Sequence, residues 1–445
     1  MNRREFIKAG TGAFFIAAAD RVLGAGAASN RVRLAIIGCR EGGRGFCVMQ
    51  NAIKVPGVEI AVVCDVDSRA LVAAAAKIKE LTGGEPRKEK DVRKVLAMPD
   101  VDGILCVTPD HWHAWIAWAA MKAGKAIYVE KPCSFCQRES EILLATQRAT
   151  NGIFQMGNQR RSDPNNFAAI KAIREGAIGT PVWGKTWYTA TRKPIGRGKV
   201  VAVPDWLDWD LWQGPAPRTD YRDNIVHYNW HWKLRWGTGE NGNNAPHFTD
   251  VVRWALGEEG YPVRTTAGGG RFFDEGDDWE WPDSVNATWE FADRKFITWE
   301  CMSCVLNNPY MGTSTGGMVY GLDGAVLFRA NATAALFDKS GKMVREWTDG
   351  DNKAPTPELN RVMSFGSRDV AHLARFADCI RARDPKTAST AEDAVKSVSM
   401  THFANIAQLS GETVRADART GALVGATPEL AKFWSREYEK GWEMA

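Results

Sequence analysis

The chain has 445 residues, of which 44% are hydrophobic and 25% charged, and its 57 Lys and Arg nearly balance 53 Asp and Glu. This composition is ordinary for a globular protein and excludes collagen-like and largely disordered chains. The net charge of +4, with no run of basic residues, gives no electrostatic reason to expect nucleic-acid binding. The length predicts two or three domains.

Residues 1–28 have the order of an export signal. A twin-arginine pattern at 3–8 precedes an apolar stretch at 9–19 and small residues at 25–27 that suit signal peptidase. The apolar stretch is shorter than the roughly 20 residues that a membrane-spanning helix needs. We therefore expect a periplasmic or otherwise exported protein without stable membrane insertion.

Alternating strands and helices predict a dinucleotide-binding domain over residues 31–157. The apolar run 32–38 ends in glycine, as a buried parallel strand does, and a second run, 59–65, ends in a carboxylate. The alternation continues as in a doubly wound parallel sheet, whose ligands lie beyond the C-terminal ends of the strands. Further strands are expected at 103–107, 126–130 and 153–157, and helices at 112–123 and 137–150.

The loop after the first strand is rich in glycine, but Arg40 occupies the second glycine position of Gly-x-Gly-x-x-Gly. It fits Gly-x-Gly-Gly-Arg-Gly with a two-residue insertion, which places a pyrophosphate on the helix N-terminus. Asp65 would accept hydrogen bonds from the adenosine ribose and repel a 2′-phosphate, favouring NAD over NADP, although Arg69 nearby weakens this preference. The predicted cofactor ligands are Gly38, Arg40, Gly42, Gly43, Arg44, Asp65, Thr108, His113, Glu130, Lys131 and Asn158.

Motifs at 108–113 (Thr-Pro-Asp-His-Trp-His), 123–125, 129–132 (Val-Glu-Lys-Pro), 239–257 and 376–381 give the chain a resemblance to a known family. From about residue 31 to its C-terminus it resembles the Gfo/Idh/MocA oxidoreductases, and its tail resembles their exported, sugar-associated branch. The resemblance implies an α/β protein whose Rossmann domain is followed, over 158–445, by an α+β domain. That domain has a large open, mostly antiparallel sheet, which carries the substrate site and often the interface of a homo-oligomer, either a dimer or a tetramer.

Lys131 follows a strand end, and a buried amine beside a cationic nicotinamide can work as a general base. The resemblance implies that His247 shuttles the proton of the reacting hydroxyl and that Asp250 binds substrate. Their spacing places both side chains on one helical face. Asn243 stands where an Asp usually precedes this His, and an amide cannot take a proton. We therefore expect Asn243 at the substrate site and a departure from the inositol-dehydrogenase relay.

Residues 227–232 (His-Tyr-Asn-Trp-His-Trp) form another dense group. In an extended segment, the two imidazoles would face one way, and Tyr228 and Trp230 the other. We interpret the group as a sugar site in which His227 and Trp230 bind substrate and His231 or Tyr228 supplies a further base. Metal on the two His is the alternative, but no partner carboxylate supports it, and we expect none. The stripe of Trp at 206, 209 and 212 is interpreted as packing.

Two C-x-x-C pairs, at 133–136 and 301–304, are too far apart in sequence for a compact zinc ribbon. We interpret these cysteines as small buried hydrophobes, with zinc or redox chemistry as the alternative. Glycines at 268–270 and 312–317 predict turns or a mobile loop over the site. Amphipathic helices are expected at 367–383 and 391–411, after a loop at 355–357.

These patterns predict an exported, NAD-dependent oxidoreductase that acts on a sugar or glycoside, with Lys131 and His247 handling the hydroxyl proton. Because NAD is scarce outside the cytoplasm, a tightly held cofactor that recovers its hydride within the cycle is expected. That chemistry is either dismutation between two sugars or glycoside cleavage through oxidation at C3, elimination and re-reduction. A non-catalytic glycan-binding protein with structural NAD is the alternative from another class, and a dehydrogenase using diffusible NAD is disfavoured by the export signal.

Overall fold

The computed structural model describes residues 31–305, 310–348 and 367–444. The predicted export signal at 1–28 and the predicted loop at 355–357 lie outside the described residues. Within the described ranges, no helix combines the length and the hydropathy that crossing a membrane requires.

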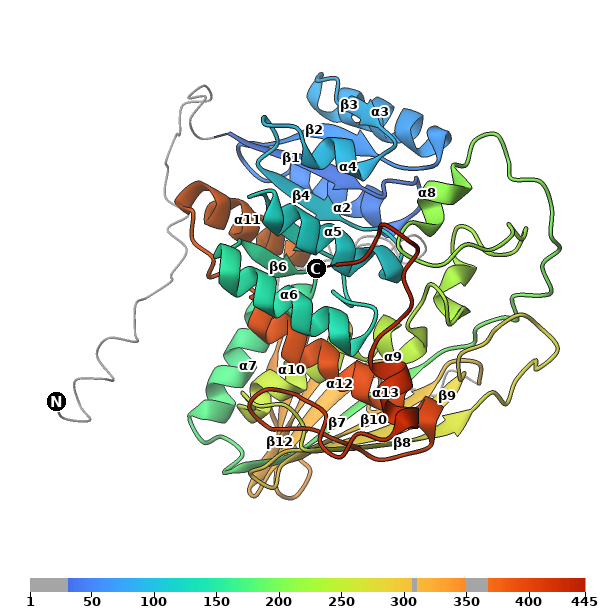
Figure 1. The fold of residues 1–445 in the computed structure, drawn as a ribbon. Coiled ribbons are helices and arrows are strands. Elements are labelled where there is room, and N and C mark those ends of the chain that lie inside the picture. The colour runs from blue at the N-terminus through green and yellow to red at the C-terminus, as the bar shows by residue number, and fades with distance from the viewer. Residues whose placement is uncertain (1–30, 306–309, 349–366, 445) are drawn as a thin grey trace. The chain divides into compact units, whose positions relative to one another are not determined.

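The first sheet has six parallel strands in the order β3-β2-β1-β4-β5-β6. Its central strands are almost wholly buried because helices cover both faces, as their apolar runs predict (Figure 1). The order reverses between β1 and β4, and ligands of such sheets bind at that point. The elements are β1 (Val32–Ile37), α2 (Arg44–Ile53), β2 (Val58–Cys64), α3 (Ser68–Thr82), β3 (Arg87–Glu89), α4 (Val92–Leu96), β4 (Gly103–Cys106), α5 (Asp110–Lys122), β5 (Ala126–Val129), α6 (Gln137–Thr150) and β6 (Phe154–Met156).

The second sheet has nine strands in the order β14-β13-β12-β11-β7-β10-β9-β8-β15, and only β7 and β10 pair in parallel. Helices α7 (Pro164–Arg174), α10 (Pro246–Leu256) and α12 (Ala391–Ser410) pack on its inner face, in one apolar core with the strands (Figure 1). The strands are β7 (Pro181–Thr189), β8 (Arg264–Gly270), β9 (Ser284–Glu290), β10 (Phe296–Met302), β11 (Thr315–Gly321), β12 (Gly324–Arg329), β13 (Ala334–Asp338), β14 (Met343–Trp347) and β15 (Val414–Arg415).

The glycines predicted to form turns or a mobile loop over the site lie largely within strands, so that prediction is wrong for them. Residues 268–270 end β8, and Gly317 lies inside β11. A Cβ at Gly317 would approach Val252 of α10 to 2.7 Å, so glycine at this position lets the helix lie directly on the sheet.

Helix α11 (Ser367–Ala382) crosses back to the first sheet. Leu373, Phe376 and Ala377 share a core with β1 and α2, and Asp369 forms an ion pair with Arg44 at 2.6 Å. The core of the first sheet therefore contains residues far beyond the predicted domain boundary at residue 157.

Residues 190–238, the insertion segment, run along the C-terminal edge of the first sheet with little regular structure: α8 (Trp209–Gln213) and a 3₁₀ helix, η3 (Asn229–Trp232). Trp209 and Trp212 stack at 4.8 Å in an apolar cluster, as the predicted packing stripe requires. Backbone hydrogen bonds then join the segment to the turn after β2, from Ser68 N to Trp206 O (2.9 Å) and from Asp208 N to Val66 O (3.0 Å).

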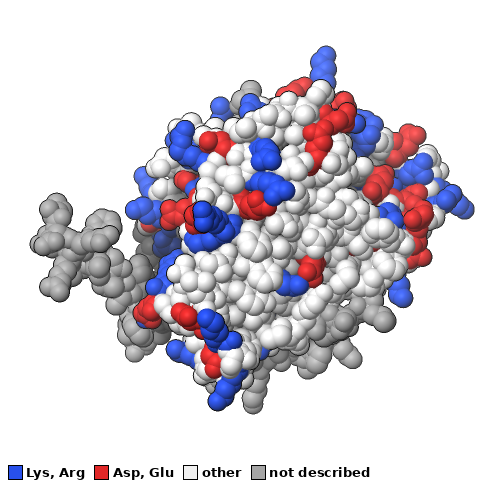
Figure 2. Space-filling model, turned by 90° about the horizontal axis from the view of Figure 1, so that it is seen from below, with Lys and Arg blue, Asp and Glu red and all other residues white. Residues whose placement is uncertain are grey.

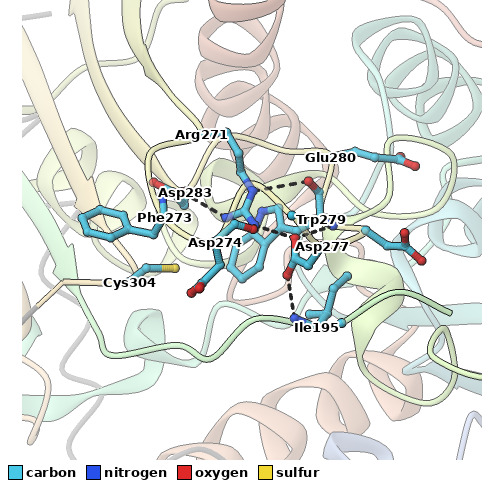
Figure 3. Close-up of polar contacts among 12 residues, drawn as sticks. Ile195, Arg271, Phe273, Asp274, Asp277, Trp279, Glu280, Asp283 and Cys304 are labelled. Carbon is cyan, nitrogen blue, oxygen red and sulfur yellow. Dashed lines mark hydrogen bonds and ion pairs between the residues drawn. The ribbon is translucent and has the colours of Figure 1, made fainter.

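A buried cluster around Arg271 fastens the insertion segment to the second sheet (Figure 3). The Arg271 guanidinium pairs with Asp277 at 2.6 Å and with Asp283 at 3.0 Å. Asp277 in turn accepts a hydrogen bond of 2.7 Å from the amide of Ile195. The segment is thus fastened to the first sheet at Trp206 and Asp208 and to the second domain at Ile195.

Candidate functional site

One cavity, with a volume of about 570 Å³, lies at the C-terminal edge of the first sheet and reaches the second domain. It brings together every predicted site residue except Asn158 and Asp250. The predicted residues that line it are Gly38, Arg40, Gly42, Gly43, Arg44, Asp65, Thr108, His113, Glu130, Lys131, His227, Tyr228, Trp230, His231, Asn243 and His247.

The glycine loop has the shape that a dinucleotide pyrophosphate requires. Gly38 has φ +82°, and a Cβ at Gly45 would lie 1.8 Å from the Gly38 carbonyl oxygen, so no side chain fits there. Gly43 is the N-cap of α2 and provides no side-chain cap, which leaves the first amides of the helix free for an anion. The residues therefore fit the predicted cofactor.

Asp65 is positioned by two backbone amides. Its carboxylate accepts hydrogen bonds from Cys39 N at 2.8 Å and Asp67 N at 3.0 Å, and each oxygen retains a lone pair for a ribose hydroxyl. Arg69 is occupied elsewhere, because it pairs with Asp67 and lies 3.5 Å from the centre of the Trp206 ring. Its presence therefore gives little support to NADP.

Burial raises the pKa of Asp65 to about 6. Ribose hydroxyls donate to the ionised carboxylate, so NAD affinity should fall as the pH drops through 6, by up to about tenfold per pH unit. Calorimetric titration of cofactor-free protein from pH 8 to 5 measures this. Asp65→Asn should bind at least tenfold more weakly at pH 8, since a charged hydrogen bond contributes about 1.5–3 kcal/mol, and should lose the pH dependence. If the NAD affinity of Asp65→Asn fell with pH as steeply as that of the wild type, the titrating group would be another residue.

Lys131 projects from the turn after β5 towards Asn243, at the end of α9 (Gly239–Asn243). Its Nζ donates to the backbone oxygen of Asn243 at 2.5 Å and lies 3.3 Å from the Asn243 Oδ1. Burial lowers the pKa of Lys131 below its ordinary value. In its neutral form the amine would have two N–H groups for Asn243 and one lone pair free for a substrate proton.

His247 lies in the first turn of α10 and lines the same end of the cavity as Lys131. Burial, together with the charges of Lys131 and Arg160, holds the pKa of His247 well below its ordinary value. The ring is therefore a neutral imidazole that can exchange hydrogen bonds with a substrate hydroxyl.

Two other predicted cofactor ligands have roles in holding the site. The ring of His113 spans two strand-end turns, with Nδ1 2.7 Å from Pro132 O and Nε2 2.8 Å from Thr108 O. Glu130 forms an ion pair with Arg44 at 3.0 Å and so ties β5 to α2.

The prediction of an extended segment at 227–232 is wrong. Residues 229–232 form η3, and the rings of Trp230 and His231 stack at 3.6 Å instead of pointing to opposite faces. His227 lies at the adenosine end of the cavity, with Nε2 3.0 Å from Asp67 Oδ2, and not at the predicted substrate position. Only Tyr228 and His231 remain near Lys131.

His231 has a defined tautomer. Its Nδ1 lies 2.6 Å from the carbonyl oxygen of Tyr228, which can only accept, so Nδ1 carries the proton and Nε2 has a lone pair. Burial lowers the pKa of His231 to about 3, which makes it a weak base. Trp230, predicted to stack on a sugar, is mostly buried and donates its ring N–H to His227 O.

Asp250 and Asn158 do not line the cavity. Asp250 is fully buried and accepts from Arg161 at 2.9 Å, from Ser397 at 2.6 Å and from Asn158 at 2.8 Å. Its carboxylate has no capacity left for a sugar hydroxyl, so the structure corrects its predicted role to that of a buried support for the cavity wall.

Three arginines that line the cavity, Arg160, Arg192 and Arg368, were not predicted from the sequence. Arg192, in the insertion segment, pairs with the buried Glu240 at 2.5 Å and donates to the Tyr228 hydroxyl at 2.9 Å. Arg160, in the 3₁₀ helix η2 (Gln159–Ser162), lies over the ring of Phe248. Its position directly after the last strand of a Rossmann sheet was a signal that could have revealed it.

The described residues contain no group of three or more His, Cys, Asp and Glu arranged to hold a metal. All nine cysteines are free, and burial raises the pKa of both Cys133 and Cys136 to about 12. These thiols stay protonated at neutral pH, so the structure favours the interpretation of small buried hydrophobes.

Two models of one family match the chain. The oxidoreductase family model for the NAD-binding Rossmann fold matches residues 32–158, and the model for its C-terminal alpha/beta domain matches 171–279. Together they cover more than half of the chain. The chain belongs to the Gfo/Idh/MocA oxidoreductase family. The predicted NAD-binding fold and the α+β second domain are thereby confirmed.

Curated relatives within the family have several names. A glycosyl hydrolase family 109 protein of Saccharopolyspora erythraea is 29% identical over 210 residues, which are 44% of this chain and 45% of that protein. The scyllo-inositol 2-dehydrogenase (NAD(+)) of Bacillus subtilis is 32% identical over 157 residues, 35% of this chain and 44% of its own. The chain thus spans less than half of the length of these relatives.

Solved structures of similar proteins share the fold over most of the chain. Levoglucosan dehydrogenase, in complex with NADH and levoglucosan, superposes with a TM-score of 0.65 at 19% identity, over 86% of this chain and 99% of that one. The aldose-aldose oxidoreductase from Caulobacter crescentus, in complex with glycerol, has a TM-score of 0.63 at 18% identity, with the same shares covered. The α/β architecture predicted from the sequence is confirmed.

Proposed function

We propose that this Gfo/Idh/MocA protein is an NAD-dependent oxidoreductase acting on a sugar or glycoside. The observation that carries the proposal is the single cavity that joins the glycine loop and Asp65 to Lys131, Asn243 and His247. Bound NAD supplies an acceptor and donor of hydride for a sugar carbon. The similarity to a scyllo-inositol 2-dehydrogenase and to a levoglucosan dehydrogenase supports a carbohydrate substrate.

The residues around the reacting hydroxyl have separate tasks. Lys131 takes the hydroxyl proton through its free lone pair as the carbon is oxidised, and returns it when the carbon is reduced. Neutral His247 hydrogen-bonds the same hydroxyl and orients it. Asn243 holds the amine of Lys131 in place through its two oxygens.

Redox-assisted glycoside hydrolysis is the second candidate. Oxidation at C3 acidifies the C2 hydrogen, a base removes that proton as the C1 substituent leaves, water then adds at C1, and C3 is reduced again. Tyr228 favours this version, because it lines the same cavity as Lys131, its hydroxyl accepts a hydrogen bond of 2.9 Å from Arg192, and the residue is 42% exposed. Tyr228 is a better candidate than His231, whose pKa of about 3 makes it a poor base. The similarity to a glycosyl hydrolase family 109 protein supports it.

We also propose export through a twin-arginine signal in residues 1–28, which N-terminal sequencing of protein recovered outside the cytoplasm would test. The hydrogen bonds between the insertion segment and the β2–α3 turn support a cofactor that is held throughout the cycle. Such retention suits a compartment where NAD is scarce.

We further propose a homo-oligomer formed through the outer face of the second sheet. That face is broad and carries most of its charges at the rim (Figure 2). Trp183 stacks with Tyr320 at 4.6 Å and with Phe296 at 5.6 Å on this side, beside the ion pair of Lys185 and Glu300. Light scattering coupled to size exclusion tests this proposal.

Turnover without added NAD tests the proposed function. The purified protein with its bound cofactor should convert many equivalents of a sugar or glycoside, with no net accumulation of NADH absorbance at 340 nm. For glycosides in D₂O, hydrolysis by the redox route should place deuterium at C2 of the product sugar, because the abstracted proton exchanges with solvent.

Two results would contradict a closed cycle. Stoichiometric NADH release, with turnover that stops unless NAD is supplied, would make the protein an ordinary dehydrogenase. Bound NAD that no sugar or glycoside reduces would favour the non-catalytic, glycan-binding alternative.

A further inference from the structure

Arg160 is a buried cation at the substrate end of the cavity. Only 5% of the residue is exposed, yet it lines the cavity together with Lys131 and His247. Its guanidinium lies 4.0 Å from the centre of the Phe248 ring, next to His247 in α10. The guanidinium therefore borders the space that a substrate bound to Lys131 and His247 would occupy.

Arg160 forms no ion pair with a carboxylate in the part of the chain that the structure describes, although the charge of Asp163 acts on it. Its two Nη atoms donate to the backbone oxygens of Arg329 (3.2 Å) and Ala330 (3.4 Å), and its Nε has no hydrogen-bond partner. Burial, with a contribution from the nearby Arg368, holds the pKa of Arg160 well below its ordinary value. An unpaired buried guanidinium is costly unless an anion neutralises it.

The guanidiniums of Arg44, Arg192 and Arg368, which also line the cavity, differ from that of Arg160, because each of these three faces a carboxylate of the protein. Arg44 pairs with Asp369 at 2.6 Å, and Arg192 pairs with Glu240 at 2.5 Å. Arg368 lies 3.5 Å from Asp163. Asp163, whose charge acts on Arg160, is thus already paired with Arg368, and a ligand must supply the missing charge.

We propose that the substrate carries a carboxylate, as a hexuronic acid or its glycoside does, and that Arg160 binds this group. The inference rests on the proposed function, since it names the class of sugar that the same site takes. A carboxylate suits a planar guanidinium, which can donate two parallel N–H bonds to it. The backbone oxygens of Arg329 and Ala330 and the Phe248 ring hold the guanidinium plane in place for that contact.

Matched sugars test the proposal on the protein with its bound cofactor. Glucuronate, galacturonate and mannuronate are compared with their amides and with glucose, galactose and mannose. Binding is followed by quenching of tryptophan fluorescence, and oxidation by the absorbance of reduced cofactor at 340 nm. At least one uronate should bind tenfold or more tightly than both its uncharged amide and its parent sugar. The amide comparison uses the wild-type chain, so it does not depend on how any variant folds.

Three variants assign the preference to this residue. Arg160→Gln should abolish the preference for the uronate over its amide and its parent sugar, and Arg160→Lys should retain part of that preference. Arg264→Gln, which removes a charge from the exposed pair with Glu290, should leave the preference intact. NAD content is measured in each variant, because loss of NAD from Arg160→Gln would show that the residue neutralises the cofactor instead and would overturn the proposal.

The outcomes separate this inference from the proposed function. Reduction of bound NAD by neutral sugars at least as well as by uronates, with no effect of Arg160→Gln on the ratio, would overturn the inference and leave the proposed function standing. Uronate binding that depends on Arg160 but never reduces NAD would support the inference and contradict the proposed function. An Arg160-dependent preference for galactose 6-sulfate over every uronate would replace the carboxylate by a sulfate ester and overturn the assignment.

Discussion

Replacing Lys131 by Met should lower turnover by about 10²- to 10⁴-fold, the usual contribution of a general acid–base group, while the fold and the bound NAD remain. The methionine side chain is similar in length to that of lysine but has no amine, so it cannot accept the hydroxyl proton. The amine of Lys131 is also the group that contacts both oxygens of Asn243. Single-turnover measurements of sugar oxidation at 340 nm, together with the NAD content of the purified variant, check the prediction.

Lys171→Met is the matched control. Lys171 is an exposed residue of α7, paired with Glu175 at 2.8 Å, and it does not line the cavity. Its loss should change stability by no more than about 1 kcal/mol and leave turnover as in the wild type. Wild-type turnover in a folded, NAD-loaded Lys131→Met protein would remove this lysine from the mechanism.

Replacing Asp250 by Asn should lower the free energy of unfolding by about 3–5 kcal/mol, because it leaves the buried Arg161 guanidinium without its main counterion. Arg161 approaches both oxygens of Asp250, at 2.9–3.1 Å, and Asp250 also accepts from Ser397 and Asn158. Chemical denaturation at pH 7 measures the loss. The matched control is Asp384→Asn, whose exposed partner Arg375 lies 3.8 Å away, and it should change stability by no more than about 1 kcal/mol.

The effect of Asp250 should depend on pH in a defined direction. Burial alone would raise the pKa of this carboxyl, but the charge of Arg161 outweighs burial and holds the pKa below its ordinary value of 3.8. A carboxyl with a depressed pKa stabilises the fold above its unfolded pKa and loses this contribution as the pH falls through its folded pKa. The difference between wild type and Asp250→Asn should therefore be full at pH 6–7 and shrink below about pH 4. A difference that stays constant down to pH 3 would contradict the ion-pair explanation.

The strands of the first sheet other than β3 could be predicted because burial on both faces requires unbroken apolar runs, as in β1, β4 and β5. Helix α6 was predicted to its terminal residues. Strand β3 could not be predicted, because Arg87–Glu89 is an exposed edge strand with no apolar residue. The glycines of β8 and β11 were misassigned, because glycine also occurs inside strands, and at Gly317 it marks the close approach of α10.

The site could be predicted where it follows the ends of parallel strands, as at Asp65 and Lys131. The placement of side chains in the insertion segment could not be predicted, because it depends on packing between distant parts of the chain. The alternation expected for 227–232 assumed an extended backbone, whereas η3 turns His227 and His231 towards opposite ends of the cavity. No sequence pattern indicates that Arg192 pairs with a carboxylate or that Arg160 does not.

The return of α11 to the first sheet has a consequence for the timing of folding during synthesis. Asp369, which pairs with Arg44, is 325 positions further along the chain. At roughly 5–20 residues per second, a ribosome needs about 15–65 s to cover that distance. During this time the surface that Leu373 and Phe376 later cover on β1 and α2 is exposed. The cofactor-binding half is therefore completed only near the end of translation, and a fragment that stops at residue 157 should be prone to aggregation.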